Sequence, residues 1–290
     1  MRFKIIDELR DKYSVLLLCS YLKVSRSGYY NWINNDRPMH KCFDEKLAEL
    51  IQDIFDKTKK GYRFITHQLR RYYGIIVNRK KTLRYMQILG IKSPIRKSRY
   101  ECCTQQDINE KSRIVHENFL DRNFEASRPL EKLVTDVSYV YHQSGRLYLS
   151  VIKDLYDNSI LAYSLSKWNS NELVFDNLNQ VFTNNWDITR FCIFHSDRGF
   201  QYTNLRYIKY LDEKGITISH SRKANCLDNA CCENFFSHLK SESLELDIPI
   251  DENDLIKRVK EFIIWYNNDR PQDKLKGMTP FEFRRSFLSI

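Results

Sequence analysis

Residues 132–142 have the sequence KLVTDVSYVYH, in which β-branched and aromatic residues dominate and one carboxylate, Asp136, interrupts an otherwise apolar run. Two runs of similar composition follow, RLYLSVIKDL at 146–155 and SILAYSLSK at 159–167, with Gly or Asn between the runs. Short runs of this kind, bounded by turn residues, are typical of β-strands. The three runs therefore predict a β-meander.

The pattern then changes to alternating helices and strands. Helices are expected over about 171–182 and 205–213 and from 229 onward, with strands at RFCIFHSD (190–197) and ITISH (216–220). The order β-β-β-α-β-α-β-α is that of a mixed sheet with helices on its faces. We therefore expect an α/β core over 128–245, built on a mixed five-stranded sheet with flanking helices.

Residues 246–290 are expected to form a C-terminal helical extension. Its longest helix has apolar residues at helical spacing, namely Leu255, Val259, Phe262, Ile263 and Tyr266. Thr279, Pro280 and Glu282 predict a capping box at the start of a last short helix.

The first 100 residues carry most of the positive charge. They contain 23 Lys and Arg against 9 Asp and Glu, whereas the remaining 190 residues contain 24 against 28. Such a region suits a polyanionic partner such as DNA, and the alternative is a solvated basic surface. The region has helical patterns throughout, which predict an N-terminal helical segment over 1–38 and a second all-α domain over 39–100.

Within 39–100, a helix ending near Gly74 and a helix over about 78–89 are joined by a short turn and resemble a helix-turn-helix. Asn78 can cap the second helix. The side chains predicted to contact DNA are all basic, and they are Arg70 and Arg71 on the first helix and Arg79, Lys80, Lys81 and Arg84 on the second. The alternative is an ordinary helical bundle with a charged outer face. A polar connector over 101–127, with a helix near 109–120, would join this domain to the core.

No stretch approaches the roughly 18 consecutive apolar residues that a membrane helix needs. The eight cysteines include no C-x-x-C pair, so reduced and mostly buried thiols are expected. These features favour an intracellular protein without a membrane partner.

Three carboxylates stand beside buried runs: Asp136 within a strand, Asp197 at a strand end, and Glu233 on a helix. Burying an unpaired charge costs several kcal/mol, so such groups need a compensating cation. Magnesium and manganese prefer oxygen ligands, and two such ions about 3.5–4 Å apart can act on both the attacking and the leaving oxygen of a phosphodiester. Taken singly, each acid could instead form a salt bridge or cap a helix.

The strings around these acids are more specific, and 35 residues separate Asp197 from Glu233. TDVSYV surrounds the first acid, HSDRGFQY the second and SRKANCLDNACCENFFSHLKSE the third, and YNNDRPQDKLKGMTPFEF follows. In this order they resemble the second-frame protein of insertion-sequence transposases, in the superfamily of DDE transposases and retroviral integrases. The resemblance covers nearly the whole chain and implies a ribonuclease H-like catalytic core.

The resemblance also implies roles for particular residues. Asp136, Asp197 and Glu233 would be the catalytic ligands of two Mg²⁺ or Mn²⁺ ions, and Lys240, two helical turns beyond Glu233, would contact terminal DNA. Neighbours expected to shape the site are His195, Arg198, Asn229 and Asn234. The chain departs from the family pattern at Ala224, where glycine is common, and at the adjacent thiols Cys231 and Cys232, where small residues are common. These thiols could bind soft metals, oxidise, or simply fill packing positions.

The implied function is metal-dependent DNA cleavage and strand transfer at the ends of an insertion sequence. Its partners would be double-stranded DNA, as terminal inverted repeats and target, together with further copies of the chain and a first-frame partner or fusion. The implied location is the bacterial cytoplasm, in association with the nucleoid. Two alternatives are a catalytically inert DNA-binding regulator and a general ribonuclease H-like nuclease. The basic N-terminal region and the proline-containing tail motif argue against the nuclease.

Overall fold

The computed structural model describes residues 2–34, 43–95, 114–183, 192–223 and 225–288. Helices of the N-terminal part are α1 (Arg2–Leu9), α2 (Val15–Tyr21), α3 (Arg26–Asn34), α4 (Glu45–Thr58), α5 (Tyr62–Tyr73) and α6 (Arg79–Ile88). The core contains β1 (Lys132–His142), β2 (Gly145–Asp154), β3 (Ile160–Ser166), α7 (Asn171–Thr183), β4 (Ile193–Ser196), α8 (Leu205–Glu213) and β5 (Thr217–His220). The chain continues through η1 (Cys226–Asn229), α9 (Ala230–Leu239), the π-helix η2 (Lys240–Leu244), α10 (Glu252–Asn268), η3 (Asp273–Leu275) and α11 (Pro280–Leu288).

The five strands form one sheet in the order β3-β2-β1-β4-β5. β1, β2 and β3 pair antiparallel, whereas β4 lies parallel to β1 and β5 parallel to β4. The predicted meander and the mixed five-stranded sheet are therefore confirmed. This topology, preceded by helices, is the ribonuclease H-like α/β fold expected from the sequence.

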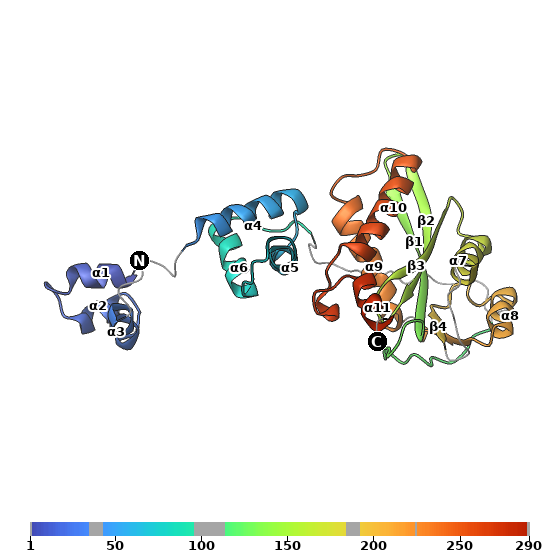
Figure 1. The fold of residues 1–290 in the computed structure, drawn as a ribbon, viewed down its shortest axis with the longest axis horizontal. Coiled ribbons are helices and arrows are strands. Elements are labelled where there is room, and N and C mark those ends of the chain that lie inside the picture. Colours follow the sequence, from blue (N-terminus) through green and yellow to red (C-terminus); the bar gives the residue numbers. More distant parts are fainter. Residues whose placement is uncertain (1, 35–42, 96–113, 184–191, 224, 289–290) are drawn as a thin grey trace.

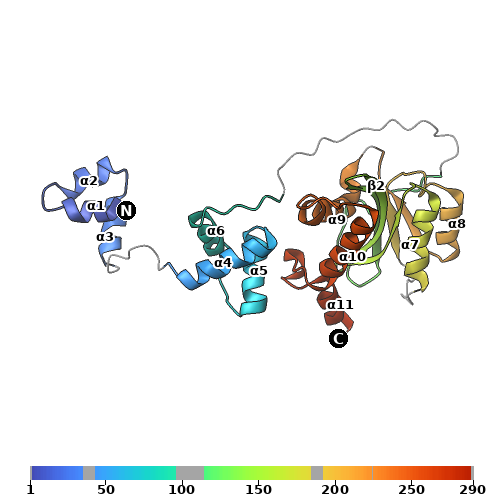
Figure 2. The same ribbon diagram turned by 90° about the horizontal axis from the view of Figure 1, so that it is seen from above.

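Helices cover both faces of the sheet. Figures 1 and 2 show α9 and α10 on one face and α7 and α8 on the other. β1 packs against the helices on both faces, because successive side chains of a strand point to opposite faces of the sheet. Val134 belongs to the hydrophobic cluster under α9 and α10, while Leu133 belongs to the cluster under α7 and α8.

The C-terminal helices have the predicted pattern. Every residue of the apolar face expected on α10 is buried. The capping box of α11 is formed, since the Thr279 amide donates to Glu282 Oε2 at 3.0 Å and the Glu282 amide to Thr279 Oγ1 at 3.3 Å. One hydrophobic cluster joins Phe235 of α9 to Phe262 of α10, so the proposed boundary between 245 and 246 runs through a shared core. The division into domains stays a prediction.

The expected helix near 109–120 is wrong over residues 114–120, and its beginning lies outside the described residues. Several backbone amides of this segment donate to the core. The Ile114 amide donates to Thr203 O at 3.3 Å, the His116 amide to His220 Nδ1 at 2.9 Å and the Leu120 amide to Ser219 Oγ at 3.2 Å. A backbone satisfied in this way needs no helix.

The N-terminal helices form two units, and Figures 1 and 2 show α1–α3 and α4–α6 as separate groups. α1–α3 pack around Ile6 and Tyr29. α4–α6 pack around Ile51 and Leu69. Gly74 ends α5 in the left-handed region with φ 65°, where glycine is favoured, and the Asn78 side chain caps α6. The helix-turn-helix predicted over α5 and α6 is present.

None of the described helices is both long and apolar enough to cross a membrane.

Candidate active site

The first two acids are brought together by the register of two parallel strands. Val134 of β1 is paired with His195 of β4, and Asp136 and Asp197 each lie two residues beyond that pair. Equal offsets from a parallel pair place both side chains at the same end of neighbouring strands and on the same face. β4 is short, so β1 loses this neighbour after Val134 and its edge is open beside Asp136.

The third acid, Glu233, is in the first turn of α9. This helix is fixed on the sheet by Phe235 and Leu239, both fully buried. Its first turn is tied to β1 by Asn229, whose Nδ2 donates to Thr135 O at 3.2 Å. Glu233 is thereby held on the β1 face that carries Asp136.

The three carboxylates act on one another electrostatically. Burial raises the pKa of Asp136 well above its usual range, and the negative charges of Asp197 and Glu233 raise it further. The pKa of Glu233 is also raised, by burial and by Asp197. Like charges gathered in a partly desolvated place disfavour their own ionisation. Such a site favours a bound cation.

A lysine completes this group. Lys240 follows α9 directly, and its Nζ donates to Ser138 Oγ at 2.9 Å and lies 4.9 Å from the centroid of the Tyr139 ring. Burial lowers its pKa, while the negative charges of Glu245 and Asp136 oppose that change. Lys240 therefore lies beside Ser138 and Tyr139 of β1, near enough to Asp136 for the two charges to interact.

The side-chain arrangement is not that of a finished metal site. Within the described residues, no group of three or more His, Cys, Asp or Glu side chains is arranged to hold a metal ion. Two of the acids are turned toward backbone, since Asp136 Oδ1 accepts from the Val137 amide and Asp197 Oδ1 from the Gly199 amide, both at 2.8 Å. The donor chemistry, three oxygen ligands that repel one another, nevertheless fits Mg²⁺ or Mn²⁺.

The other expected neighbours have different surroundings. His195 is buried between Ser219 Oγ at 2.8 Å and Ser221 Oγ at 3.0 Å, so it joins β4 to the β5 side of the sheet. Its pKa is lowered to about 4 by burial, which keeps the ring neutral. Arg198 Nε donates to Ser221 O at 2.7 Å and holds the segment after Asp197. Asn229 fixes α9 as described, and Asn234 is exposed.

Asp228, which was not among the expected site residues, anchors the segment that leads into α9. Its carboxylate is fully buried, 2.9 Å from Arg222 Nε and 2.8 Å from Arg122 Nε. Hydrogen bonds from Arg222 and then Arg122 hold its pKa well below the usual range. An acid five residues before Glu233, and closely preceded by the basic pair Arg222 and Lys223, was the available signal in the sequence.

The adjacent thiols occupy packing positions. Cys232 is fully buried in the cluster under α9, and Cys231 packs against that cluster. Burial raises the pKa of both thiols. These surroundings match the packing alternative better than soft-metal binding, which requires thiolates.

The basic residues predicted to contact DNA have different surroundings. Arg70, Lys80 and Lys81 are exposed. Arg71 and Arg79 instead form ion pairs with the C-terminal part, Arg71 with Glu282 at 2.7 Å and Arg79 with Asp273 at 2.7 Å. Arg84 is half-buried.

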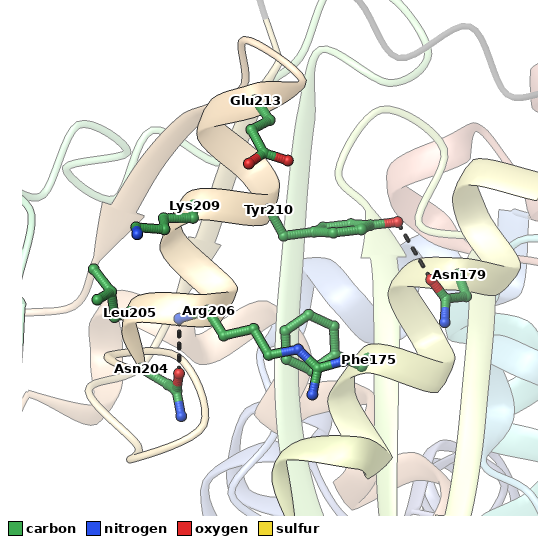
Figure 3. A pocket seen from close by; sticks show the side chains of 8 residues that line it. All are labelled: Phe175, Asn179, Asn204, Leu205, Arg206, Lys209, Tyr210 and Glu213. Carbon is green, nitrogen blue, oxygen red and sulfur yellow. Dashed lines mark hydrogen bonds between the residues drawn. The ribbon is translucent and has the colours of Figure 1, made fainter.

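A separate hollow lies between α7 and α8 (Figure 3). Arg206 lies 4.4 Å from the Phe175 ring centroid, and Tyr210 donates to Asn179 Oδ1 at 3.3 Å across it. None of the predicted catalytic residues lines it.

Comparison with known families and proteins agrees with this architecture. Models of an integrase core domain match residues 126–226 and 233–288, and a model of an HTH-like domain matches 43–99. An Escherichia coli K12 protein named as the transposase InsK of element IS150 is 37% identical over 97% of both chains. Transposase InsF of IS3fB, from the same organism, is 27% identical over 100% of both chains.

Among solved structures, the HTLV-2 integrase catalytic core in complex with magnesium is 14% identical, with a TM-score of 0.44, over 55% of this chain and 98% of that one. The sequence relatives and the family models together are decisive. The chain belongs to the family of insertion-sequence transposases with an integrase core domain.

Proposed function

We propose that the chain catalyses metal-dependent cleavage of DNA at the ends of an insertion sequence and joins the freed 3′ hydroxyl to another phosphodiester. The observation that carries this proposal is the placement of Asp136, Asp197 and Glu233 at one end of the sheet, beside Lys240. Keeping neighbouring carboxylates ionised is unfavourable unless a cation is bound between them, so this arrangement suits a cation-dependent reaction on a polyanion.

The three carboxylates would hold two Mg²⁺ or Mn²⁺ ions, and such ions supply activation of the attacking oxygen and stabilisation of the leaving oxygen. Lys240, braced by Ser138 and Tyr139, would pair with a non-bridging phosphate oxygen and orient the DNA. Asn229 and Asp228 keep the start of α9, and hence Glu233, in place. The chain needs no covalent intermediate of its own.

The DNA partners would be the terminal inverted repeats and the target. α5 and α6 would bind the repeats through Arg70, Lys80, Lys81 and Arg84, with Arg71 and Arg79 contributing if their ion pairs with the C-terminal part open. Synapsis of two ends would require at least a dimer, together with a first-frame partner or fusion, in the bacterial cytoplasm on the nucleoid.

The proposal is tested with purified full chain, the first-frame partner, element-end DNA and Mg²⁺ or Mn²⁺. Nicked ends and joined products are expected, and they should disappear with Asp136→Ala and with DNA of scrambled end sequence. Site-specific binding with no cleavage by any form would favour an inert regulator. Cleavage of scrambled DNA without joining would favour a general nuclease.

A binding prediction concerns the exposed lysines of α6. Lys80→Ala combined with Lys81→Ala should weaken binding to end DNA. Each lysine that pairs with a phosphate releases a counterion from the DNA, and this release favours binding. The slope of log affinity against log salt should become shallower by about 1 for each lysine. Fluorescence anisotropy over a salt series measures this, with Lys46→Ala on α4 as the exposed control. An unchanged slope in the double variant would place the DNA on another surface.

A further inference from the structure

A buried group of charges lies where α4–α6 meet the core. Lys60, between α4 and α5, has its Nζ 2.8 Å from Glu242 Oε2 and 3.6 Å from the Trp265 ring centroid. Arg270 reaches the same carboxylate, with NH2 2.8 Å from Oε1 and Nε 3.1 Å from Oε2. The side chains of Lys60, Glu242 and Arg270 are only 11%, 7% and 13% exposed. This burial distinguishes them from surface ion pairs.

Glu242 is the shared acceptor of this group. Burial alone would favour its neutral form, but hydrogen bonds from His238 and Arg270 hold its pKa well below the usual range. His238 Nδ1 lies 2.8 Å from Oε1. Without the Glu242 charge, the ammonium of Lys60 and the guanidinium of Arg270 would face each other in a desolvated place, where like charges repel strongly.

The position of Glu242 along the chain gives the contact its significance. It belongs to η2, the π-helical continuation of α9, in which the Glu245 amide donates to Lys240 O at 2.8 Å. Lys240 is therefore two residues from the carboxylate that receives Lys60. Single π-turns inside helices are frequent at functional sites. A displacement of η2 would move the Lys240 ammonium relative to Ser138 and Asp136.

A second set of contacts also joins α4–α6 to the C-terminal part of the chain, but these side chains are more exposed. Asp273 is 38% exposed in its pairs with His67 and Arg79, and Glu282 is 37% exposed in its pair with Arg71. Exposed pairs contribute little and are screened by salt. Among these described contacts, the Lys60–Glu242 pair is the most buried, so it is the one least screened by solvent.

We propose that Glu242 is a positioning residue, which by receiving Lys60 couples docking of the helix-turn-helix domain to the placement of Lys240 beside the catalytic carboxylates. This inference rests on the proposed strand transfer. DNA bound by α5 and α6 would then be processed efficiently only when the domain is seated on η2.

The first test uses three variants. Lys60→Met keeps an apolar side chain on Trp265 but loses the charge, and Lys60→Arg keeps the charge. Lys57→Met removes a lysine elsewhere. Lys57 is exposed on α4 and serves as the matched control. With Lys60→Met, end-DNA affinity should stay within about twofold of wild type while the rate of cleavage and joining falls by at least about tenfold. Lys60→Arg should recover most of that rate. Equal rates for Lys60→Met and Lys57→Met would overturn the proposal.

The second test needs no activity. Acetic anhydride should modify Lys60 of the folded full chain much more slowly than Lys57, as followed by mass spectrometry of peptides. Glu242→Gln should expose Lys60 to modification while circular dichroism stays that of the wild type. Should Glu242→Gln not fold, the wild-type comparison of Lys60 with Lys57 decides, and equal modification rates would refute the docking. A wild type that cuts no DNA while Lys60 is protected would refute the proposed function and leave the docking intact.

Discussion

The substitution Asp136→Asn is expected to abolish strand transfer and yet to stabilise the metal-free protein. The loss of activity should be at least about 10³-fold, since a carboxylate ligand of a catalytic ion accounts for several kcal/mol and about 1.4 kcal/mol corresponds to a factor of ten. The gain in stability follows because the substitution would remove one charge from a site where Asp197 and Glu233 repel it.

The pH dependence of that gain has a definite sign. Asp136 has a raised pKa in the folded state, so the folded protein binds its proton more tightly than the unfolded chain does. Its favourable contribution is present below the ordinary carboxyl range of about 4 and is lost as the pH rises through the raised value. The groups that act on it are Asp197, Glu233 and Lys240. The advantage of Asp136→Asn should therefore grow from pH 4 toward neutrality.

Thermal unfolding with and without Mg²⁺ measures both effects. Ions that bind only the folded form should stabilise the wild type by about 2.7 kcal/mol at a concentration 100 times the Kd, and should stabilise Asp136→Asn much less. Asp176→Asn, at an exposed carboxylate of α7, controls for a change of net charge. A variant less stable than the wild type at neutral pH, with an equal response to Mg²⁺, would contradict the role assigned to Asp136.

The sheet and its helices could be predicted because their signals are local. β1, β2 and β3 are continuous runs of strand-forming residues, and α10 has its apolar face at helical spacing. The helix expected near 109–120 failed over its described part because the amides of that segment donate to β5 and to Thr203. Composition does not report partners that are distant in the sequence.

The same limit applies to the candidate site. Asp136, Asp197 and Glu233 can be predicted from the sequence because each stands beside an apolar run and because the surrounding strings resemble a known family. Lys60 and Glu242 are 182 residues apart, so no local pattern joins them. The pairing depends on how α4–α6 sit on the core, which the sequence pattern did not address.

Replacing Arg284 by methionine is expected to lower the free energy of unfolding by about 3–5 kcal/mol. Arg284 of α11 donates through Nε to Asp157 and through NH2 to Asp154, and all three side chains are buried. Methionine would fill similar space but leave two carboxylates buried without their cation. Asp154 also accepts hydrogen bonds from the Leu130 and Tyr156 amides. Loss of Arg284 would therefore also weaken the hydrogen bonds that hold the backbone at the end of β2.

The pH response makes this prediction specific. Burial and the charge of Asp157 raise the pKa of Asp154 to about 6, and Arg284 opposes that rise. Without Arg284 the pKa should rise further, so the deficit of the variant should be smallest near pH 4, where Asp154 is protonated, and largest above pH 6. Urea unfolding over that range measures it, with the exposed Arg285→Met as control, expected to change stability by less than about 0.5 kcal/mol. A deficit independent of pH would mean that Arg284 acts by packing alone. A loss of about 3–5 kcal/mol that grows with pH would mean that α11 is part of the folding unit of the catalytic core, because its guanidinium neutralises the acids at the end of β2.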